Sequence, residues 1–489
     1  PVQGYIKLAS QGRYLEALEL IKNENPFPAV CGRICNRACE DACTRGDIDD
    51  PIAIDDIKKF IADKELSAET RFVPKMLNQT GKPFTNKIAV IGGGPSGLSC
   101  AYYLAVKGYP VTVFEKGDKV GGMLTRILPS FRLEKDVVEA EIKVLRDLGV
   151  EFRCGVDVGK DVTIAQLREQ GYKAFYLAAG AWKSAPVGCT GDDKAGVWGG
   201  IEFLKAVNAG EDVKIGKNVA VIGGGNTAMD VARTAIRLGA ENVYVIYRRT
   251  AEEMPAAADE VAEAEAEGVQ FKYLVKPAEI LGDESVTGIR LQCMELSAVS
   301  DSSGRRQPIE RKGVFEELAV DSVIAATGQK VDLGNMPTAP RSSAARTAPW
   351  SSIPSLQTGE PDIRRRRRRH RTEVCHDAIA AGKEGPSPST ASCTRARAWC
   401  SVAVRVSLDR TTWSSPSEPT IPRQKAADGS PEEARRLPRP AAPHGGAVEG
   451  DGALPAAAPS CRRHASAAAS APPRKFDAIH LERVRDVVA

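Results

Sequence analysis

The chain has 489 residues, enough for several domains, and a formal net charge of +4 that is unremarkable for this length. No apolar run is long enough to span a bilayer, so we expect no membrane association. The sequence begins at Pro1 without a methionine or a signal-peptide pattern, and we therefore expect a fragment that lacks its true start. Of the 12 cysteines, four lie within residues 31–43. Such clustering favours metal or redox use in a reducing compartment and predicts a cytoplasmic protein.

The N-terminal region carries this cysteine cluster between two helical segments. Apolar positions recur at helical spacing over residues 5–24, and a second helix fits residues 52–66. The segment between them, CGRICNRACEDACTRG, contains Cys31, Cys35, Cys39 and Cys43. Thiolates this close together can converge on an iron–sulfur cluster. Free thiols and a zinc site are the alternatives, although structural zinc sites usually pair a C-x-x-C with a distant second pair.

A dinucleotide-binding pattern follows in NKIAVIGGGPSGLSCAYYLAVKGYPVTVFEK, residues 86–116. It reads as strand, glycine turn, helix and strand, with Gly92, Gly94 and Gly97 forming G-x-G-x-x-G. The first glycine allows the tight turn, the second lets the backbone approach a pyrophosphate, and the third lets the helix pack on the strand. Glu115 ends the second strand, where an acid can bind ribose hydroxyls. A glycine-rich turn without a ligand is the structural alternative.

The pattern repeats in GKNVAVIGGGNTAMDVARTAIRLGAENVYVIYRRT, residues 216–250. The residues of its turn are Gly223, Gly225, Asn226, Thr227 and Ala228. Its second strand ends in Arg248 and Arg249 instead of an acid. An acid would repel the 2′-phosphate of NADP, whereas arginines attract it. The first fold therefore suits FAD and the second NADPH, although one of the two arginines could be an ordinary solvated strand end.

Two short segments are expected to lead the chain between these folds. AFYLAAGAW (174–182) and DSVIAATGQK (321–330) read as strands that end in small-residue turns. Gly328 would let the backbone approach the flavin. Further candidate cofactor contacts are Pro95, Ser96, Lys116 and Gly122.

These motifs together resemble the small subunit of NADPH-dependent glutamate synthase and the N-terminal half of dihydropyrimidine dehydrogenase. The resemblance covers residues 1–338 and includes GGML (121–124), PSFRLEKDV (129–137), YRRTAEEMPA (247–256) and AATGQ (325–329). In that family NADPH reduces FAD, and electrons leave through [4Fe-4S] clusters. Cysteines that match Cys35, Cys39 and Cys43 are cluster ligands there, and further ligands lie upstream of the position of Pro1. Lys58 lies near a position where some relatives offer Gln or Glu to a cluster.

The resemblance implies an α/β protein with an N-terminal helical iron–sulfur domain and two Rossmann-like folds, the NADPH domain being inserted in the FAD domain. The expected domains are 1–75 (iron–sulfur), 76–205 (FAD), 206–325 (NADPH), 326–385 (return to the FAD domain) and 386–489 (low-complexity tail).

Near residue 339 the sequence becomes rich in Ala, Pro, Ser and Arg. Within DIRRRRRRHRTEVCHDAIAAGKE, residues 362–384, the run Arg364–Arg369 stands where relatives carry a strand, a Gly-Asp flavin turn and a helix. With suitable arginine codons, a shifted reading frame can give FAGGDVVTGPKSV at this point. A similar shift can turn residues 464–474 into CIGCGVCTTK, part of a ferredoxin cluster motif. We therefore expect residues 339–474 to be out of frame, and the tail as written to be disordered.

The predicted function is that of an NADPH-dependent flavin and iron–sulfur oxidoreductase. Hydride transfer from nicotinamide to flavin requires positioning and no side-chain acid or base, so no catalytic residue is predicted. Electrons would pass through [4Fe-4S] clusters to a large catalytic subunit or to ferredoxin. One alternative is an inactive fragment or scaffold whose FAD site is broken. A nucleic-acid patch or localisation signal built on the arginine run is another, but aromatic residues and a recognisable module are missing, so we expect no nucleic-acid partner.

Overall fold

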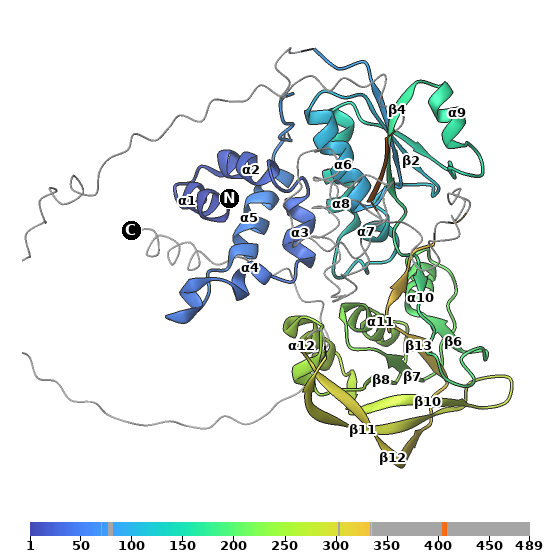
Figure 1. Ribbon diagram of the computed structural model, residues 1–489. Helices are drawn as coiled ribbons and strands as arrows, with labels where there is room; N and C mark the ends of the chain where they lie inside the picture. Colours follow the sequence, from blue (N-terminus) through green and yellow to red (C-terminus); the bar gives the residue numbers. More distant parts are fainter. Residues whose placement is uncertain (70, 77–81, 302–303, 333, 335–402, 408–489) are drawn as a thin grey trace, which may run out of the picture. The chain divides into compact units, whose positions relative to one another are not determined.

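The computed structural model describes residues 1–69, 71–76, 82–301, 304–332, 334 and 403–407 (Figure 1). All of these residues belong to one compact unit of the chain. Two regions interpreted from the sequence lie outside the described residues. They are the arginine run, which we expect to be an out-of-frame flavin turn, and residues 464–474, which we expect to be an out-of-frame ferredoxin motif. None of the described helices is both long and apolar enough to cross a membrane.

The N-terminal region is helical, as predicted. Its elements are α1 (Val2–Ser10), α2 (Tyr14–Lys22), α3 (Pro28–Ile34), α4 (Ala38–Asp41), the 3-10 turn η1 (Thr44–Asp47) and α5 (Ile54–Leu66). The apolar stretch 5–24 forms two helices, because Gly12 between them takes a positive φ of 74° that a continuous helix cannot contain. Leu18 on α2 and Ile61 on α5 are buried in the same core, which holds the two helices together.

The first nucleotide fold is a sheet with helices on both faces. Its elements are β1 (Lys87–Ile91), α6 (Pro95–Val106), β2 (Val111–Glu115), α7 (Met123–Arg126), α8 (Lys135–Asp147), β3 (Glu151–Cys154), α9 (Ile164–Glu169) and β4 (Tyr172–Ala178). The strand order is β15-β4-β1-β2-β3, in which only β15 (Ala403–Ser407) runs antiparallel. Successive residues of β1 face opposite sides of the sheet: Val90 packs with α6 and α8, and Ala89 packs with α9.

The second nucleotide fold is a parallel sheet of order β6-β13-β7-β8-β9. Its elements are β6 (Val197–Gly199), α10 (Gly200–Asn208), β7 (Asn218–Ile222), α11 (Asn226–Arg237), β8 (Asn242–Tyr247), the 3-10 turn η2 (Ala251–Glu253), α12 (Ala258–Ala266), β9 (Gln270–Tyr273) and β13 (Ser322–Ala325). Val221 packs with α10 and α11, whereas Ile222 faces an antiparallel sheet. The strands of that sheet are β10 (Val275–Leu281), β11 (Gly288–Ser300) and β12 (Arg306–Leu318).

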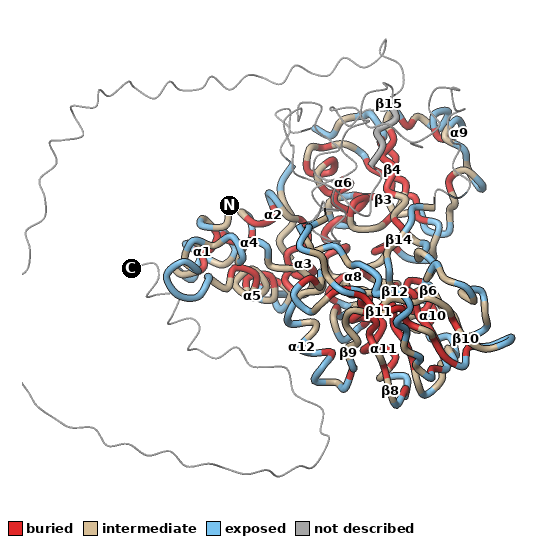
Figure 2. The backbone as a smooth tube through the Cα atoms, turned by 60° about the horizontal axis from the view of Figure 1, so that its bottom comes forward, coloured by how far each residue is buried: buried red, intermediate tan, exposed pale blue. Residues whose placement is uncertain are grey.

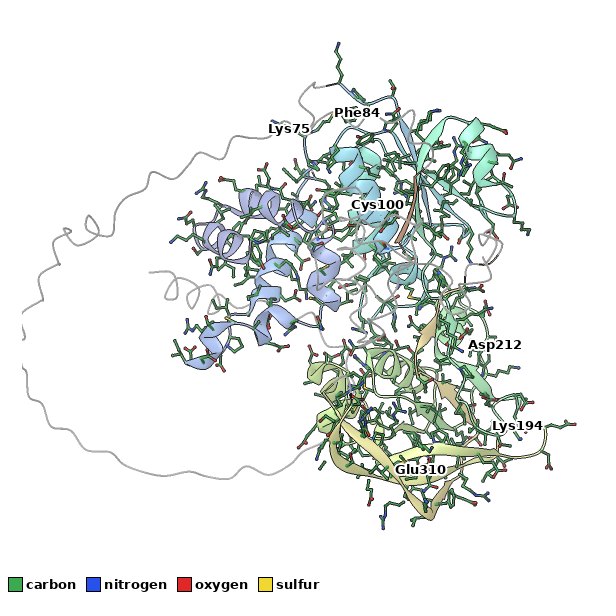
Figure 3. All side chains as sticks on the ribbon, viewed as in Figure 1. Lys75, Phe84, Cys100, Lys194, Asp212 and Glu310 are labelled. Atoms are coloured by element: carbon green, nitrogen blue, oxygen red, sulfur yellow. The ribbon has the colours of Figure 1, made fainter. Side chains whose placement is uncertain are left out.

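Burial follows this layered arrangement. Residues of β1, β7 and β13 are almost all buried, whereas β12 is mostly exposed; buried segments are red in Figure 2. Cys100, labelled in Figure 3, lies on α6 in the first core and is buried. That thiol therefore belongs to the core of the first fold, which also includes Cys31 of the N-terminal cysteine cluster.

The chain passes between the two folds at a pair of neighbouring strands. It leaves the first fold after β4 through β5 (Lys183–Ser184) and returns after β13 through β14 (Gln329–Lys330). β5 and β14 pair antiparallel, and β15 then rejoins the first sheet. Strands at the two predicted crossings are thus confirmed. β6 precedes residue 206, where we expected the NADPH domain to start, yet it pairs in the second sheet; the domain boundaries stay predictions.

Candidate functional site

The glycine turn of the first fold links β1 to α6. Gly92 has a φ of 106°, and a Cβ added to it would lie 2.2 Å from the carbonyl oxygen of Ala178. A Cβ on Gly97 would lie 1.9 Å from the carbonyl oxygen of Gly92. At Gly94, the N-cap of α6, an added Cβ would meet only Gly122 Cα, at 3.9 Å. Gly92 and Gly97 are therefore required by the fold itself, whereas the space in front of Gly94 can admit a pyrophosphate.

Glu115 lies at the end of β2, where the sequence predicts a ribose-binding acid. Its Oε2 accepts a hydrogen bond from the backbone N–H of Gly93 at 2.8 Å, and its Oε1 accepts one from Gly117 at 2.8 Å. The side chain is buried, and it borders a pocket. A carboxylate oxygen can accept more than one hydrogen bond, so Glu115 can hold the turn and still accept from ribose hydroxyls.

That pocket brings together three separated parts of the chain. The predicted contacts that line it from the first fold are Gly92, Gly94, Pro95, Ser96, Glu115, Lys116 and Gly122. The second fold contributes Asn226 and Thr227. The cysteine segment contributes Ile34, Cys35 and Asn36. A lining that joins a phosphate-binding turn, a ribose acid and the turn of a second dinucleotide fold fits FAD in contact with a nicotinamide nucleotide.

Several lining residues carry no signal in the sequence. Leu124, Ile127, Leu128 and Trp182 supply apolar surface, and Val156 to Val158 lie against the Glu115 end. Such residues are ordinary core types, and only their position beside the glycine turn gives them a role. Leu124 belongs to the GGML segment and Leu128 directly precedes PSFRL, and these two segments of the family resemblance were the one signal that pointed to this region.

The turn of the second fold repeats the construction of the first. Gly223 has a φ of 143°, and an added Cβ would lie 2.3 Å from the carbonyl oxygen of Ala326. Gly225 is the N-cap of α11, and Ala228 is fully buried at the third position of the motif. Asn226 Oδ1 accepts a hydrogen bond from the backbone N–H of Ala257 at 2.9 Å, so the turn is tied to the start of α12.

The two arginines after β8 differ in their surroundings. Arg248 is exposed. Arg249 is buried, and its Nε donates to the carbonyl oxygen of Arg306 at 2.8 Å while Nη2 donates to Asp301 Oδ2 at 2.7 Å. Their placement at the strand end agrees with the sequence, but Arg249 is engaged within the protein.

Gly328 lies at the crossing and not in the pocket lining. Its carbonyl oxygen accepts a hydrogen bond from Ala185 at 2.8 Å, and its φ of 141° favours glycine. Its neighbours Gln329 and Asp332 do line the pocket. Close approach of Gly328 itself to a flavin stays a prediction.

The four clustered cysteines are distributed over α3, α4 and the start of η1. Cys31 is buried on α3, Cys35 caps that helix, Cys39 lies on α4 and Cys43 precedes η1. None of these four described cysteines forms a disulfide. Among the described residues, no group of three or more His, Cys, Asp or Glu side chains is arranged to hold a metal ion. The thiols are suitable cluster ligands chemically, but in the described part of the chain they do not enclose a cluster by themselves.

Lys58 supplies positive charge beside these thiols. It forms an ion pair with Asp55, and both side chains are largely buried. Burial raises the pKa of the Cys35 thiol to about 11, while the nearby charge of Lys58 acts in the opposite direction. The pKa of Cys39 is raised for the same reasons. A thiolate would therefore form more readily with Lys58 present than without it.

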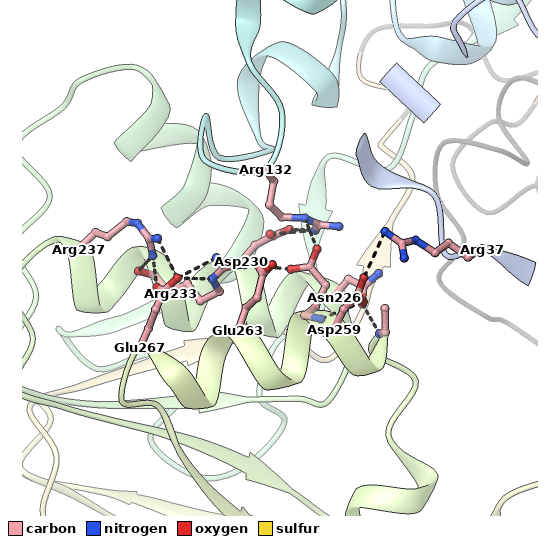
Figure 4. Close-up of polar contacts among 11 residues, drawn as sticks. Arg37, Arg132, Asn226, Asp230, Arg233, Arg237, Asp259, Glu263 and Glu267 are labelled. Carbon is pink, nitrogen blue, oxygen red and sulfur yellow. Dashed lines mark hydrogen bonds and ion pairs between the residues drawn. The ribbon is translucent and has the colours of Figure 1, made fainter. Parts of the chain in front are cut away.

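A buried ion pair joins the two nucleotide folds at the pocket (Figure 4). Arg132, in the loop before α8, donates through Nη1 to Asp230 Oδ1 at 2.9 Å and Oδ2 at 2.8 Å. Arg132 also pairs with Glu260 on α12 at 2.8 Å. Burial raises the pKa of Asp230, and the Arg132 charge opposes that effect. Both residues line the pocket, so the ion pair fixes one fold against the other where their cofactors would meet.

A second, weaker connection reaches the cysteine segment. Arg37, between Cys35 and Cys39, lies 3.6 Å from Asp56 on α5 and 3.9 Å from Asp259 on α12. Figure 4 shows Arg37 extending toward Asp259. Its φ of 56° is in the left-handed region. The segment between the cysteines is thus linked to the second fold by charge.

Comparison with known proteins assigns a family to the nucleotide-binding part of the chain and to its N-terminal part. Residues 86–341 match the pyridine nucleotide-disulphide oxidoreductase family, and residues 1–70 match the family described as dihydropyrimidine dehydrogenase domain II, 4Fe-4S cluster. These matches confirm the predicted fold class and the predicted combination of FAD, NADPH and iron–sulfur chemistry.

Curated relatives are consistent with these two family matches. The chain is 40% identical over 353 residues to the NADP(+)-dependent formate dehydrogenase subunit beta of Moorella thermoacetica, covering 68% of this chain and 50% of that protein. It is 38% identical over 343 residues to the NADPH-Fe(3+) oxidoreductase subunit beta of Geobacter sulfurreducens, covering 69% and 50%. The chain thus spans about half the length of these two relatives.

A shorter relative confirms the resemblance seen in the sequence. The chain is 37% identical over 347 residues to the glutamate synthase [NADPH] small chain of Escherichia coli, covering 67% of this chain and 72% of that protein. With a family match over residues 86–341 and a relative of this kind, the chain belongs to the pyridine nucleotide-disulphide oxidoreductase family and is of the glutamate synthase small-chain type.

Proposed function

We propose that this protein is an NADPH-dependent flavoenzyme that takes electrons from NADPH and delivers them to a partner subunit or to ferredoxin. The observation that carries the proposal is the shared pocket, whose lining joins the FAD-type turn, the NADPH-type turn and the cysteine segment. Bound FAD would supply the chemistry of the reaction, accepting hydride from NADPH and releasing electrons singly. The chain's own residues bind and orient the two nucleotides.

The first fold would hold FAD through backbone and one carboxylate. The open face of Gly94 at the start of α6 admits the pyrophosphate, where the helix N-terminus favours negative charge. Glu115 would accept hydrogen bonds from the ribose. Leu124 and Leu128 line the apolar part of the pocket and exclude water from it.

The second fold would hold NADPH in the same way, with Gly225 at the start of α11 and Arg248 at the end of β8. Asn226 and Thr227 lie in the shared lining, so this nucleotide reaches the flavin site from the second fold. The ion pair between Arg132 and Asp230 would keep the two folds in register during transfer.

The cysteine segment offers the exit for electrons. Ile34, Cys35 and Asn36 line the flavin pocket directly, so a cluster held by thiolates of this segment would lie beside it. Cys31, Cys35, Cys39 and Cys43 are the candidate ligands in this chain. The acceptor is proposed to be a large catalytic subunit or ferredoxin, because the formate dehydrogenase and Fe(3+) oxidoreductase relatives are both named as subunits. That these described cysteines form no disulfide supports a reducing, cytoplasmic location.

A spectroscopic titration tests the proposal. The full chain is purified under anaerobic conditions, its flavin and iron contents are measured, and NADPH is added stepwise. Flavin absorption that bleaches with NADPH, and much less with NADH at equal concentration, is the expected result. A colourless protein that binds neither nucleotide would instead identify the chain as an inactive fragment or scaffold.

A further inference from the structure

Residues 123–128 belong to the first fold, but their side chains pack into the cores of both folds. Leu124 is buried in the core of the first fold, and Leu128 packs against that core. Ile127, with 4% of its surface exposed, is instead buried in the core of the second fold. All three residues line the shared pocket. The position of this segment therefore determines part of the flavin pocket, and that position depends on both folds at once.

The segment contains the short helix α7, and a helix ends with carbonyl groups that have no partner within it. The first fold supplies one partner for these groups. Lys135, the first residue of α8, donates through Nζ to the carbonyl oxygen of Leu124 at 3.0 Å and to that of Leu128. A lysine side chain can satisfy the last carbonyls of a helix in this way. Lys135 thus supports the segment from within its own fold.

The second fold supplies another partner. Asn208, the last residue of α10, donates through Nδ2 to the carbonyl oxygen of Ile127 at 2.7 Å. The same nitrogen lies 3.3 Å from the carbonyl oxygen of Arg126 and 3.4 Å from that of Leu128. Leu204, one turn earlier on the same face of α10, lines the pocket and is buried in the second core. One face of α10 therefore contributes a lining side chain and also holds the backbone of the lining segment.

Asn208 is absent from the described residues that line the pocket, so its effect on the pocket passes through the segment it holds. A buried carbonyl that loses its donor must find another partner or remain unpaired, which is unfavourable. Without Asn208 the segment would keep the support of Lys135 but lose the hydrogen bond at Ile127 that ties it to the second fold.

We propose that Asn208 is a positioning residue through which the NADPH-binding fold completes the flavin pocket of the other fold. By holding the carbonyls of residues 126–128, it fixes the apolar lining of that pocket relative to the fold that would carry the nicotinamide nucleotide. The inference rests on the proposed function, because it concerns the geometry of hydride transfer at the same pocket. Such transfer is sensitive to position, and a displacement of about 1 Å can slow a reaction on the order of 100-fold.

The first test needs no flavin and compares hydrogen exchange in the full-length wild type, N208A and N242A. N242A is the matched control, because Asn242 of the same fold donates through Nδ2 to Asn218 Oδ1 at 2.9 Å, at the start of β8. We expect the amides of Ile127 and Leu128, which donate to the Met123 carbonyl, to exchange about fivefold faster in N208A, as for the loss of one hydrogen bond. Unchanged exchange of these amides in N208A would overturn the proposal.

The second test measures flavin reduction by rapid anaerobic mixing of the FAD-loaded full chain with NADPH. In N208A we expect the rate constant at saturating NADPH to fall about tenfold, while the NADPH concentration that gives half of this rate stays within about twofold. N242A should match the wild type in both quantities. A rate in N208A equal to that in N242A would contradict the proposal, and so would a change confined to the half-saturating concentration.

Two further variants make the result independent of the folding of N208A. N208D keeps the size of the side chain but loses the donor, so it should reduce flavin as slowly as N208A. N208Q keeps the amide and should recover part of the rate. Failure of the proposed function would look different, because the wild type itself would then take up no flavin that NADPH can reduce. The exchange experiment would still decide whether Asn208 holds the segment.

Discussion

Nη1 of Arg132 donates to both carboxylate oxygens of Asp230, at 2.9 and 2.8 Å, in a buried contact between the loop before α8 and helix α11. Less than a tenth of either side chain is exposed. The contact joins the two nucleotide folds at the pocket where FAD and NADPH would meet. Both charges are removed from water, so they need compensation within the protein, which Asp230 and Glu260 together give to Arg132.

The first prediction concerns this pair. D230N removes one of the two carboxylates that compensate the buried Arg132, Glu260 being the other, and we expect the free energy of unfolding to fall by about 2 kcal/mol. The control is D147N, which breaks the exposed i,i+4 pair of Lys143 and Asp147 and should cost at most about 0.5 kcal/mol. Urea unfolding of the full chain measures both. A D230N protein as stable as the control would show that the pair does not hold the folds together.

The second prediction separates two glycines of one motif. G92A forces a side chain onto a φ of 106° and against the Ala178 carbonyl, so the protein should fold poorly. G94A has room for its methyl group within the protein but fills the space proposed for the pyrophosphate. We expect G94A to keep its melting temperature measured without added flavin. Its FAD affinity should fall about tenfold or more, as overpacking costs about 1–3 kcal/mol.

Flavin content per chain and a thermal melt, recorded for both variants, measure these effects. If G94A retained full flavin, the cradle assigned to Gly94 would be wrong. If G92A folded normally, the close approach of position 92 to the Ala178 carbonyl would not limit folding.

The third prediction is a pH dependence of stability from Glu141 on α8. Burial raises its pKa to about 8, the charges of Lys22 and Arg71 lower it, and that of Glu65 raises it. Arg71 lies 3.8 Å from the carboxylate, too far for a hydrogen bond, so burial dominates. Between the ordinary value of 4.5 and about 8 the folded protein binds a proton that the unfolded chain lacks, so stability falls as pH rises through this window.

E141Q removes this titration. We expect wild type and E141Q to have similar stability near pH 5, and E141Q to be more stable at pH 9 by up to an amount on the order of 4 kcal/mol. Denaturant unfolding across this pH range measures the difference. The control is E139Q on the same helix, whose exposed side chain pairs with Arg146 and should leave the pH slope unchanged. Parallel pH profiles for wild type and E141Q would refute the assignment.

Local parts of the site could be predicted from the sequence. A strand, a glycine turn, a helix and an acid follow one another within residues 86–116, and their order and spacing are typical of a dinucleotide-binding fold. Contacts between distant segments could not. Arg132 and Asp230 are 98 positions apart, and Arg249 and Asp301 are 52 apart. Their meeting depends on how the folds dock, which no local pattern encodes. For the same reason the sequence did not reveal that Cys35 lines the flavin pocket, or that Arg249 faces the protein.

The pairing of β5 with β14 has a consequence for how the chain is made. Ser184 lies opposite Gln329, so the whole second fold must leave the ribosome before β5 gains its partner. The edge of β4 gains its partner later still, because that partner is β15, which is synthesised after β14. We expect the second fold to form first as a closed unit, while the unfinished first sheet presents an open strand edge to other nascent chains. Slow completion of this kind makes the yield of native protein depend on temperature and on chaperones more than its final stability would suggest.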